Sequence, residues 1–231
     1  MKIFGKNAIK EAINNPKKIK KITISDNFKD QEIINLIKDN NIKYEKLPSY
    51  ILDKQEVKNQ GIMAIIDDYE YYNIKDLLND NIIVILDHLE DPHNLGAIIR
   101  TCEAAGINSI VIPKDRSVDV NQTVMKTSSG ALNYMKIARV TNLVNTINIL
   151  KDNNYFIYGA DMSGIDYKKV SYSEKVVLVI GNEGKGISNL VRESCDEIIS
   201  LPMNGHVNSL NASVAASILI YDLISRWKYG L

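Results

Sequence analysis

Short apolar runs recur along the C-terminal two thirds of the chain, and they constrain its fold more than any other sequence feature. Each run spans four to six residues, and stretches with helical spacing separate one run from the next. Strands of a parallel sheet have this pattern because helices cover both faces of such a sheet. The runs occupy residues 82–87, 109–113, 155–159, 176–180 and 198–201. The sequence therefore predicts an α/β domain with a mainly parallel sheet.

The spacing of apolar residues also predicts the helices of this domain and a smaller α/β unit before it. In the larger domain, helices are expected at 95–105, 143–152, 187–193 and 212–227. In the smaller unit, helices are expected at 5–14 and 31–38, and strands at 21–25, 43–47 and 61–66.

A polar stretch with three tyrosines at 69–72 separates the two units, and residues 74–78 have the pattern of one short helix. We therefore expect a small α/β domain at 1–68, a linker at 69–81 and the larger domain at 82–231. Exposed tyrosines can stack on bases. Packing against the domains is the commoner role of such side chains.

Charges balance over the whole chain but not along it. Of 231 residues, 28 are basic and 28 acidic, so the net charge of zero provides no overall attraction to nucleic acid. Residues 1–24 nevertheless contain seven lysines and one acid, with Lys17, Lys18, Lys20 and Lys21 in a cluster. Such a cluster is either the solvated edge of a strand or a patch that binds phosphate.

Cys102 and Cys195 are the two cysteines, which do not suit a disulfide framework and indicate a reducing compartment. The first residues lack the apolar core of a signal peptide, and no apolar run approaches the roughly 18 residues of a membrane span. We therefore expect a cytoplasmic protein with no membrane partner. His88, His93 and His206 lack the spacing of zinc ligands, so no metal site is predicted.

Residues suited to ligand binding follow three of the predicted strands, and ligands of open α/β sheets bind outside the carboxyl ends of strands. Asn94 and Arg100 follow the first strand, six residues apart, and both are expected to project near its end. Three glycines follow the strand at 176–180, where they let backbone approach a ligand. Ser209 and Asn211 follow the last strand.

Each of these segments also has an ordinary structural interpretation. Asn94 suits a helix N-cap, the glycines suit a tight turn, and Ser209 and Asn211 suit the cap of the following helix. The glycine spacing matches neither the dinucleotide-binding fingerprint nor the P-loop. One shared ligand site explains three such loops better than three unrelated turns.

Taken together, the three segments resemble the three motifs of the SpoU group, the RNA 2′-O-ribose methyltransferases of the SPOUT superfamily. They are residues 94–101 (NLGAIIRT), 180–186 (IGNEGKG) and 201–215 (LPMNGHVNSLNASVA). The joint match covers the C-terminal 150 residues in the right order, although each segment alone is a weak signal.

The N-terminal unit, with GKNA at 5–8 and NQG at 59–61, resembles a subfamily that carries a small ribosomal-protein-like RNA-binding domain. That subfamily methylates a guanosine ribose in large-subunit (23S) ribosomal RNA. Two residues depart from its pattern: Asn59, where relatives often have His, and Asn133, where an acidic residue is usual. These departures bear on the target nucleotide and leave the three motifs intact.

The resemblance implies an α/β domain whose C-terminal part forms a trefoil knot, with S-adenosylmethionine bound in a bent form within it. The matching cofactor-binding positions are Gly181, Leu201, Met203, Ser209 and Leu210. Methyl transfer from a sulfonium needs no metal, because alignment of the hydroxyl and loss of its proton are what remain.

The resemblance also implies the catalytic residues and the assembly. Arg100 matches the key residue of the family, and Asn94, Glu183, Ser209 and Asn211 are expected to orient it, the cofactor and the ribose. An arginine is normally protonated, so Arg100 is expected to anchor the target phosphate and polarise the 2′-hydroxyl. The site is expected near a homodimer interface that includes the last helix.

The resemblance therefore implies a methyltransferase whose partner is RNA, with 23S ribosomal RNA as the expected substrate. Two alternatives stay open on the sequence: a transfer RNA guanosine 2′-O-methyltransferase, and a non-catalytic RNA-binding or ribosome assembly factor.

Overall fold

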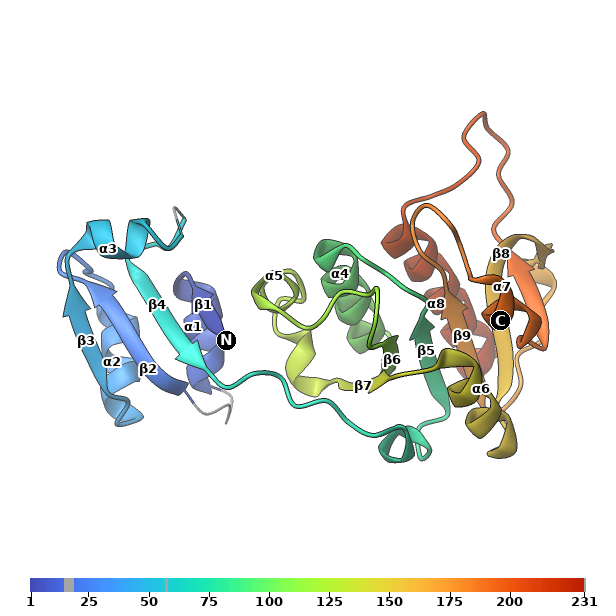
Figure 1. Ribbon diagram of the computed structural model, residues 1–231, viewed down its shortest axis with the longest axis horizontal. Coiled ribbons are helices and arrows are strands. Elements are labelled where there is room, and N and C mark those ends of the chain that lie inside the picture. The colour runs from blue at the N-terminus through green and yellow to red at the C-terminus, as the bar shows by residue number, and fades with distance from the viewer. Residues whose placement is uncertain (15–18, 57, 231) are drawn as a thin grey trace.

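The structure, a computed structural model, describes residues 1–14, 19–56 and 58–230 of the chain. Figure 1 shows two separate sheets joined by an extended segment, with the N-terminal sheet in blue and cyan and the C-terminal sheet in green to red. β4, the last strand of the first sheet, ends at Ile66, and β5, the first strand of the second, begins at Ile82.

The N-terminal unit is a mixed sheet with strand order β1-β4-β2-β3, in which β2 and β3 are parallel and β4 is antiparallel to both of its neighbours. Apolar side chains of α1 and α2, such as Ile9, Ile33 and Ile37, are buried against this sheet. The elements are β1 (Lys2–Phe4), α1 (Lys6–Asn14), β2 (Ile19–Ser25), α2 (Gln31–Asp39), β3 (Tyr44–Leu47), α3 (Ser49–Asp53) and β4 (Ile62–Ile66).

Both asparagines that depart from the family pattern have structural partners in this chain. Asn59 is buried; its Nδ2 donates to Asp53 Oδ1 at 2.7 Å, and its Oδ1 accepts the Gly61 N–H at 2.6 Å. Asn133 donates from Nδ2 to Glu11 Oε1 at 3.0 Å and so connects the larger domain to α1. Both side chains therefore have a structural role in this chain.

The tyrosine-rich part of the linker packs on the larger domain. The Tyr69 hydroxyl donates to the carbonyl of Met135 at 2.8 Å and accepts the N–H of Ile137 at 3.1 Å. The N–H of Tyr72 donates to the carbonyl of Ile137 at 2.9 Å. The short helix η1 (Ile74–Leu77) then leads into the second sheet. Tyr69 is therefore a packing residue, whereas the Tyr72 ring is exposed.

The larger domain has a six-stranded sheet with order β10-β8-β9-β5-β6-β7, and all of its pairs are parallel. The prediction of a mainly parallel sheet is confirmed. The strands are β5 (Ile82–Leu86), β6 (Ser109–Pro113), β7 (Lys136–Val140), β8 (Phe156–Asp166), β9 (Val176–Ile180) and β10 (Glu197–Ser200).

Helices cover both faces of this sheet, which explains why its strands are apolar throughout. Val84 and its alternate neighbours face α4, α5 and α8, whereas Ile83 and Ile85 face α6, α7 and η1. The helical elements are α4 (Pro92–Ala104), α5 (Gln122–Thr127), η2 (Ala131–Tyr134), α6 (Leu143–Asp152), η3 (Tyr167–Lys169), α7 (Asn189–Glu193) and α8 (Ala212–Tyr229).

Sequence reasoning missed β1 and β7 and shortened β8. β7 lies at the edge of the sheet, where Lys136 and Arg139 interrupt the apolar run. β8 continues past Gly159 to Asp166 through mostly small and polar residues, and a bulge interrupts its pairing with β10. The trefoil knot stays a prediction.

The strand order brings the candidate loops together. β5 and β9 are neighbours, so the segments that follow Leu86 and Ile180 leave the same edge of the sheet side by side. β8 lies next to β9, and β10 lies next to β8, so both bring their own carboxyl ends to that edge. The long connection from β10 to α8, residues 201–211, projects beyond it (Figure 1).

Candidate functional site

A cavity of about 310 Å³ lies at the carboxyl ends of β8, β9 and β10, beside α8. All five positions matched to a cofactor line this one cavity, as does Glu183. These five are Gly181, Leu201, Met203, Ser209 and Leu210. The structure thus brings two of the three sequence motifs into one site.

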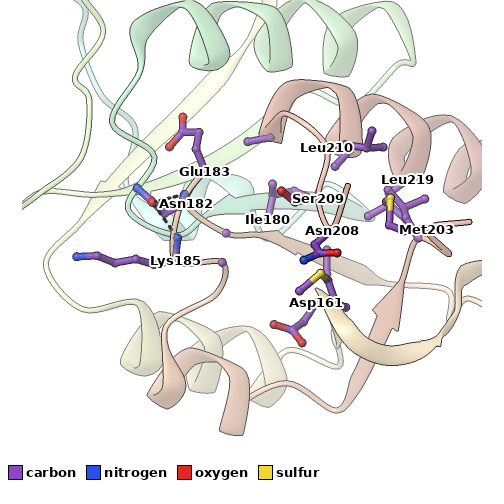
Figure 2. Close-up of a pocket in the computed structure, with 18 of the residues that line it drawn as sticks. Asp161, Ile180, Asn182, Glu183, Lys185, Met203, Asn208, Ser209, Leu210 and Leu219 are labelled. Atoms are coloured by element: carbon purple, nitrogen blue, oxygen red, sulfur yellow. Dashed lines mark hydrogen bonds between the residues drawn. The ribbon is translucent and has the colours of Figure 1, made fainter. Parts of the chain in front are cut away.

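The cavity has an apolar side and a polar side. Figure 2 shows Leu210, Leu219 and Met203 together on one side, and Glu183 and Lys185 on the other. Such a combination suits a ligand with an aromatic ring at one end and charged groups at the other.

The glycine-rich turn at 181–186 closes on itself. Asn182 and Gly186 exchange two backbone hydrogen bonds of 3.0 Å each. A Cβ at Gly181 would lie 2.1 Å from the carbonyl carbon of Gly186 and 2.3 Å from the nitrogen of Ile187. Position 181 therefore requires glycine because the turn packs against its own backbone. The sequence had suggested a different reason, the approach of backbone to a ligand.

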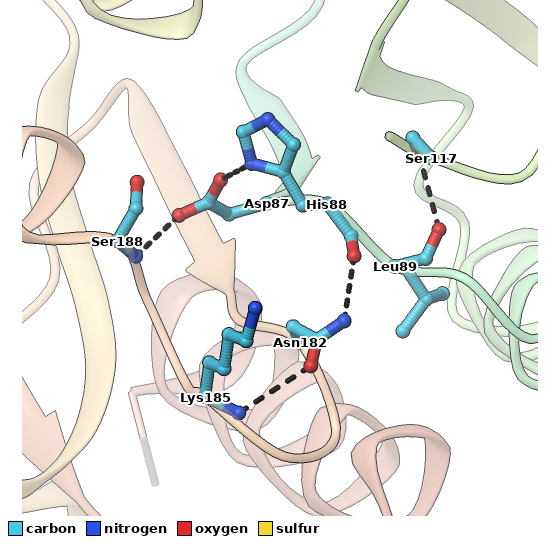
Figure 3. A network of polar contacts seen from close by, with 7 residues as sticks. All are labelled: Asp87, His88, Leu89, Ser117, Asn182, Lys185 and Ser188. Atoms are coloured by element: carbon cyan, nitrogen blue, oxygen red, sulfur yellow. Dashed lines mark hydrogen bonds and ion pairs between the residues drawn. The ribbon is translucent and has the colours of Figure 1, made fainter. Parts of the chain in front are cut away.

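A buried carboxylate connects this turn to the end of β5, as Figure 3 shows. The Asp87 side chain is 1% exposed, and its Oδ2 accepts the N–H of Ser188 at 2.6 Å while its Oδ1 contacts His88 Nδ1 at 2.5 Å. Asn182 Nδ2 donates to the carbonyl of His88 at 2.8 Å. His88 adopts a φ of +56°, which is uncommon for a residue other than glycine. These bonds hold the loops after β5 and β9 against each other.

The first and second motifs meet through a side-chain hydrogen bond. Asn94 is buried in the first turn of α4, and its Nδ2 donates to Glu183 Oε1 at 2.8 Å. The two residues are 89 positions apart in the sequence. Asn94 is not the N-cap of α4, because Asp91 occupies that position and accepts the His93 N–H.

The structure does not bring Arg100 to this cavity. Residues six apart on an α-helix differ by about 240° around its axis, so Asn94 and Arg100 point in different directions. Asn94 is buried, whereas Arg100 is exposed and has no hydrogen-bond or ion-pair partner within the described residues. Neither side chain lines the cavity, and the expectation that both project near the end of β5 stays a prediction.

Asn211 is the N-cap of α8. Its Oδ1 accepts the N–H of Ser213 at 2.9 Å and that of Val214 at 3.4 Å, and the Ser213 hydroxyl also donates to it. Asn211 does not line the cavity, whereas Ser209, two residues earlier, does. The structural interpretation of Asn211 is confirmed, and its catalytic role stays a prediction.

Asp161 is a site residue that sequence reasoning missed. It lies on the polar extension of β8 and lines the cavity from below in Figure 2. Hydrogen bonds from Ser163, first from its hydroxyl and then from its N–H, lower the pKa of the Asp161 carboxyl. The available signal was an Asp-x-Ser sequence at a strand end, which is typical of a side-chain turn.

The N-terminal lysine cluster is partly neutralised. Lys20 forms an ion pair with Asp67 at 2.7 Å, and Lys21 forms one with a carboxylate of β3 at 2.8 Å. Lys17 and Lys18 lie outside the described residues. The phosphate-binding hypothesis for this cluster stays a prediction.

Across residues 1–14, 19–56 and 58–230, no group of three or more His, Cys, Asp or Glu side chains is placed to hold a metal ion. None of the helices in that part of the chain is long and apolar enough to cross a membrane.

Two family models match the chain. The model of the SpoU rRNA Methylase family matches residues 81–221, and a model described as RNA 2′-O ribose methyltransferase substrate binding matches residues 2–72. A Staphylococcus saprophyticus protein named for the TrmH family of tRNA/rRNA methyltransferases is 43% identical over 239 residues, covering 98% of this chain and 96% of that protein. A Staphylococcus aureus protein with the same name is 42% identical over 236 residues, covering 97% and 95%.

Solved structures share the fold. The SpoU methyltransferase AviRb from Streptomyces viridochromogenes, in complex with AdoMet, has a TM-score of 0.84 at 21% identity and covers 98% of this chain and 90% of that one. The AdoMet-bound rRNA methyltransferase from Sinorhizobium meliloti has a TM-score of 0.82 at 22% identity, with coverage of 97% and 86%. Both matches extend over the two units and confirm the α/β architecture.

Proposed function

The chain belongs to the SpoU rRNA methylase family, and on that premise we propose that it methylates the 2′-hydroxyl of an RNA ribose with S-adenosylmethionine as the donor. One observation carries the proposal: segments far apart in the sequence line a single cavity at the carboxyl edge of the sheet. The bond between Asn94 and Glu183 joins the remaining motif to that cavity.

The residues of the cavity fit this cofactor. Leu201, Leu210 and Leu219 can enclose the adenine, and the irregular segment 201–210 has backbone N–H and C=O groups that no helix or strand uses. Glu183 and Lys185 carry charges opposite to the ammonium and carboxylate of the methionyl chain. When bound, S-adenosylmethionine supplies a methyl group made electrophilic by its sulfonium.

This chain's residues then have to orient the ribose and handle the hydroxyl proton. Asn94 holds Glu183 in place through their 2.8 Å hydrogen bond. The guanidinium of Arg100 can bind a phosphate through two parallel hydrogen bonds and polarise the adjacent 2′-hydroxyl. Its exposure and its freedom from partners within the described residues suit a group that meets RNA.

Arg100 does not line the cavity of its own chain, which leads us to propose a homodimer in which it serves the partner's cavity. α8 offers a matching surface, because Val214, Ile218 and Tyr221 are exposed at successive turns of one helix face. α8 also borders the cavity and packs beside α4 through the 3.0 Å contact between Ser217 and Thr101. A second copy seated on this stripe would bring its own Arg100 toward the cofactor.

We further propose that the substrate is a guanosine ribose of 23S ribosomal RNA. The N-terminal unit supports an extended RNA substrate, because a second cavity, of about 450 Å³, is lined by residues of both units. Lys58 and Lys126 provide positive charge for phosphate there, and Phe4 provides an aromatic ring on which a base can stack.

The first test uses purified protein, S-adenosylmethionine labelled on its methyl group, and two substrates. The substrates are unmodified large-subunit ribosomal RNA and unmodified total transfer RNA. We expect label in the ribosomal RNA, recovered as 2′-O-methylguanosine after digestion. Label in transfer RNA alone would show that transfer RNA, and not ribosomal RNA, is the substrate. Cofactor binding without methyl transfer to either RNA would favour a non-catalytic RNA-binding factor.

The second test addresses Arg100 and the dimer. Arg100→Ala should keep cofactor binding and lose nearly all transfer, while Glu103→Ala on the same helix should keep both. Mixing Arg100→Ala with the inactive Glu183→Ala should restore part of the activity, because a mixed dimer would contain one complete site. Absence of any recovery in proven mixed dimers would contradict the exchange of Arg100 between subunits.

A further inference from the structure

Asp161 occupies a central place in the cavity that the sheet topology explains. β8 lies between β9, which leads into the turn with Glu183, and β10, which leads into the segment with Leu201 and Met203. An acidic residue on the extension of β8 therefore lies between the polar and the apolar sides. Figure 2 shows Asp161 in this intermediate position.

The two carboxylate oxygens of Asp161 have different surroundings. Oδ1 accepts the Ser163 N–H at 3.0 Å and the Ser163 hydroxyl at 2.6 Å, and Arg192 Nη2 lies 3.9 Å from it. Oδ2 has no partner within the described residues, and it lies 3.8 Å from the position that a Cβ on Gly186 would take. The turn at Ser163 thus fixes the carboxylate with one free oxygen facing the glycine-rich turn.

We propose that Asp161 Oδ2 accepts hydrogen bonds from the ribose hydroxyls of bound S-adenosylmethionine, an inference that rests on the proposed function. If the apolar side holds adenine and Glu183 and Lys185 hold the methionyl chain, the ribose lies between them, where Asp161 is. Carboxylates recognise ribose hydroxyls in this way at the strand ends of other α/β sheets. A charged acceptor gives the stronger kind of hydrogen bond.

The test compares variants and cofactor analogues by calorimetric titration of the full-length protein. Asp161→Asn keeps an acceptor for Ser163 and puts an amide group in the place of Oδ2. We expect this change to weaken S-adenosylmethionine and S-adenosylhomocysteine equally, by about tenfold or more. In the unaltered protein, the 2′-deoxy or 3′-deoxy analogue of S-adenosylhomocysteine should bind about tenfold more weakly than the parent compound, and Asp161→Asn should abolish this difference.

Asp166→Asn, which changes another acid of β8 that does not line the cavity, is the matched control and should bind as the unaltered protein does. If Asp161→Asn weakened the binding of S-adenosylmethionine but not that of S-adenosylhomocysteine, Asp161 would lie at the sulfonium, and the inference would be overturned. Equal binding of parent and deoxy analogues by the unaltered protein would overturn it without any variant. Failure of the unaltered protein to bind either cofactor would overturn the proposed function as well.

Discussion

Replacing Gly181 by Ala tests whether the glycine-rich turn is shaped by its own backbone. The added Cβ would meet three backbone atoms: Gly186 C at 2.1 Å, Ile187 N at 2.3 Å and Gly186 O at 2.5 Å. An ordinary contact needs at least 3.4 Å, so the two strands of the turn must separate by about 1.3 Å. No side chain can rotate away to relieve this, because every contact is with backbone.

The expected change in the free energy of unfolding follows from the interactions that this separation breaks. The two backbone hydrogen bonds between Asn182 and Gly186 contribute about 1 kcal/mol each, and overpacking in a close-packed region costs about 1–3 kcal/mol. We expect Gly181→Ala to lower the free energy of unfolding by about 3 kcal/mol. In a domain of this size, that loss lowers the thermal midpoint by roughly 6–12 °C.

Thermal unfolding and titration with S-adenosylmethionine are the two assays, and the same turn supplies the control. A Cβ at Gly184 would meet only the side-chain oxygen of Asn182 at 3.7 Å, so Gly184→Ala should unfold and bind as the unaltered protein does. A Gly181→Ala protein within 2 °C of the unaltered midpoint, with undiminished cofactor binding, would refute this explanation of the turn.

Three further predictions concern buried groups. Asp87→Ala should lower the free energy of unfolding by about 3 kcal/mol in urea titrations, because it leaves the N–H of Ser188 without its charged acceptor; stability within 0.5 kcal/mol of the unaltered protein would contradict this. Asn59→Ala removes a buried side chain with several hydrogen bonds and should destabilise the N-terminal unit by about 2 kcal/mol while cofactor binding is unchanged. Burial raises the pKa of the Cys195 thiol to about 12 and raises that of Cys102 as well, so the reactive thiolates are scarce at pH 8. A chromogenic disulfide reagent at pH 8 should therefore react slowly with the folded protein and rapidly with both thiols in guanidinium, and fast reaction of the folded protein would show that the thiols are accessible.

The sheet of the larger domain could be predicted because its strands are buried on both faces. Five of its six strands contain apolar runs, and no charged residue interrupts the buried parts of these runs. The sixth strand, β7, lies at an edge of the sheet, where charged side chains are tolerated. Lys136 and Arg139 interrupt its apolar pattern, so the pattern did not predict a strand there. The extension of β8 was not predicted for a related reason. It borders a cavity, and its polar residues interrupt the apolar pattern of the strand.

The cavity itself could be predicted only in part. The five cofactor positions were matched by motif, and all five of them line one cavity. Asp161 belongs to no motif, so only the strand order brings it between the other segments. Sequence order alone places β8 before β9 and does not indicate that it lies between β9 and β10.

The spacing of Asn94 and Arg100 on α4 determines how their side chains are directed around the helix axis. Six residues on a helix turn the second side chain by about 240° from the first, so the two side chains leave α4 in directions about 120° apart. Asn94 is buried toward Glu183, which commits that face of α4 to its own chain. Arg100 is exposed elsewhere on α4, where it is available to RNA and to a second copy. If a second copy supplies Arg100 to the cavity, two chains share each site, and the recovery of activity in mixed dimers tests that proposal directly.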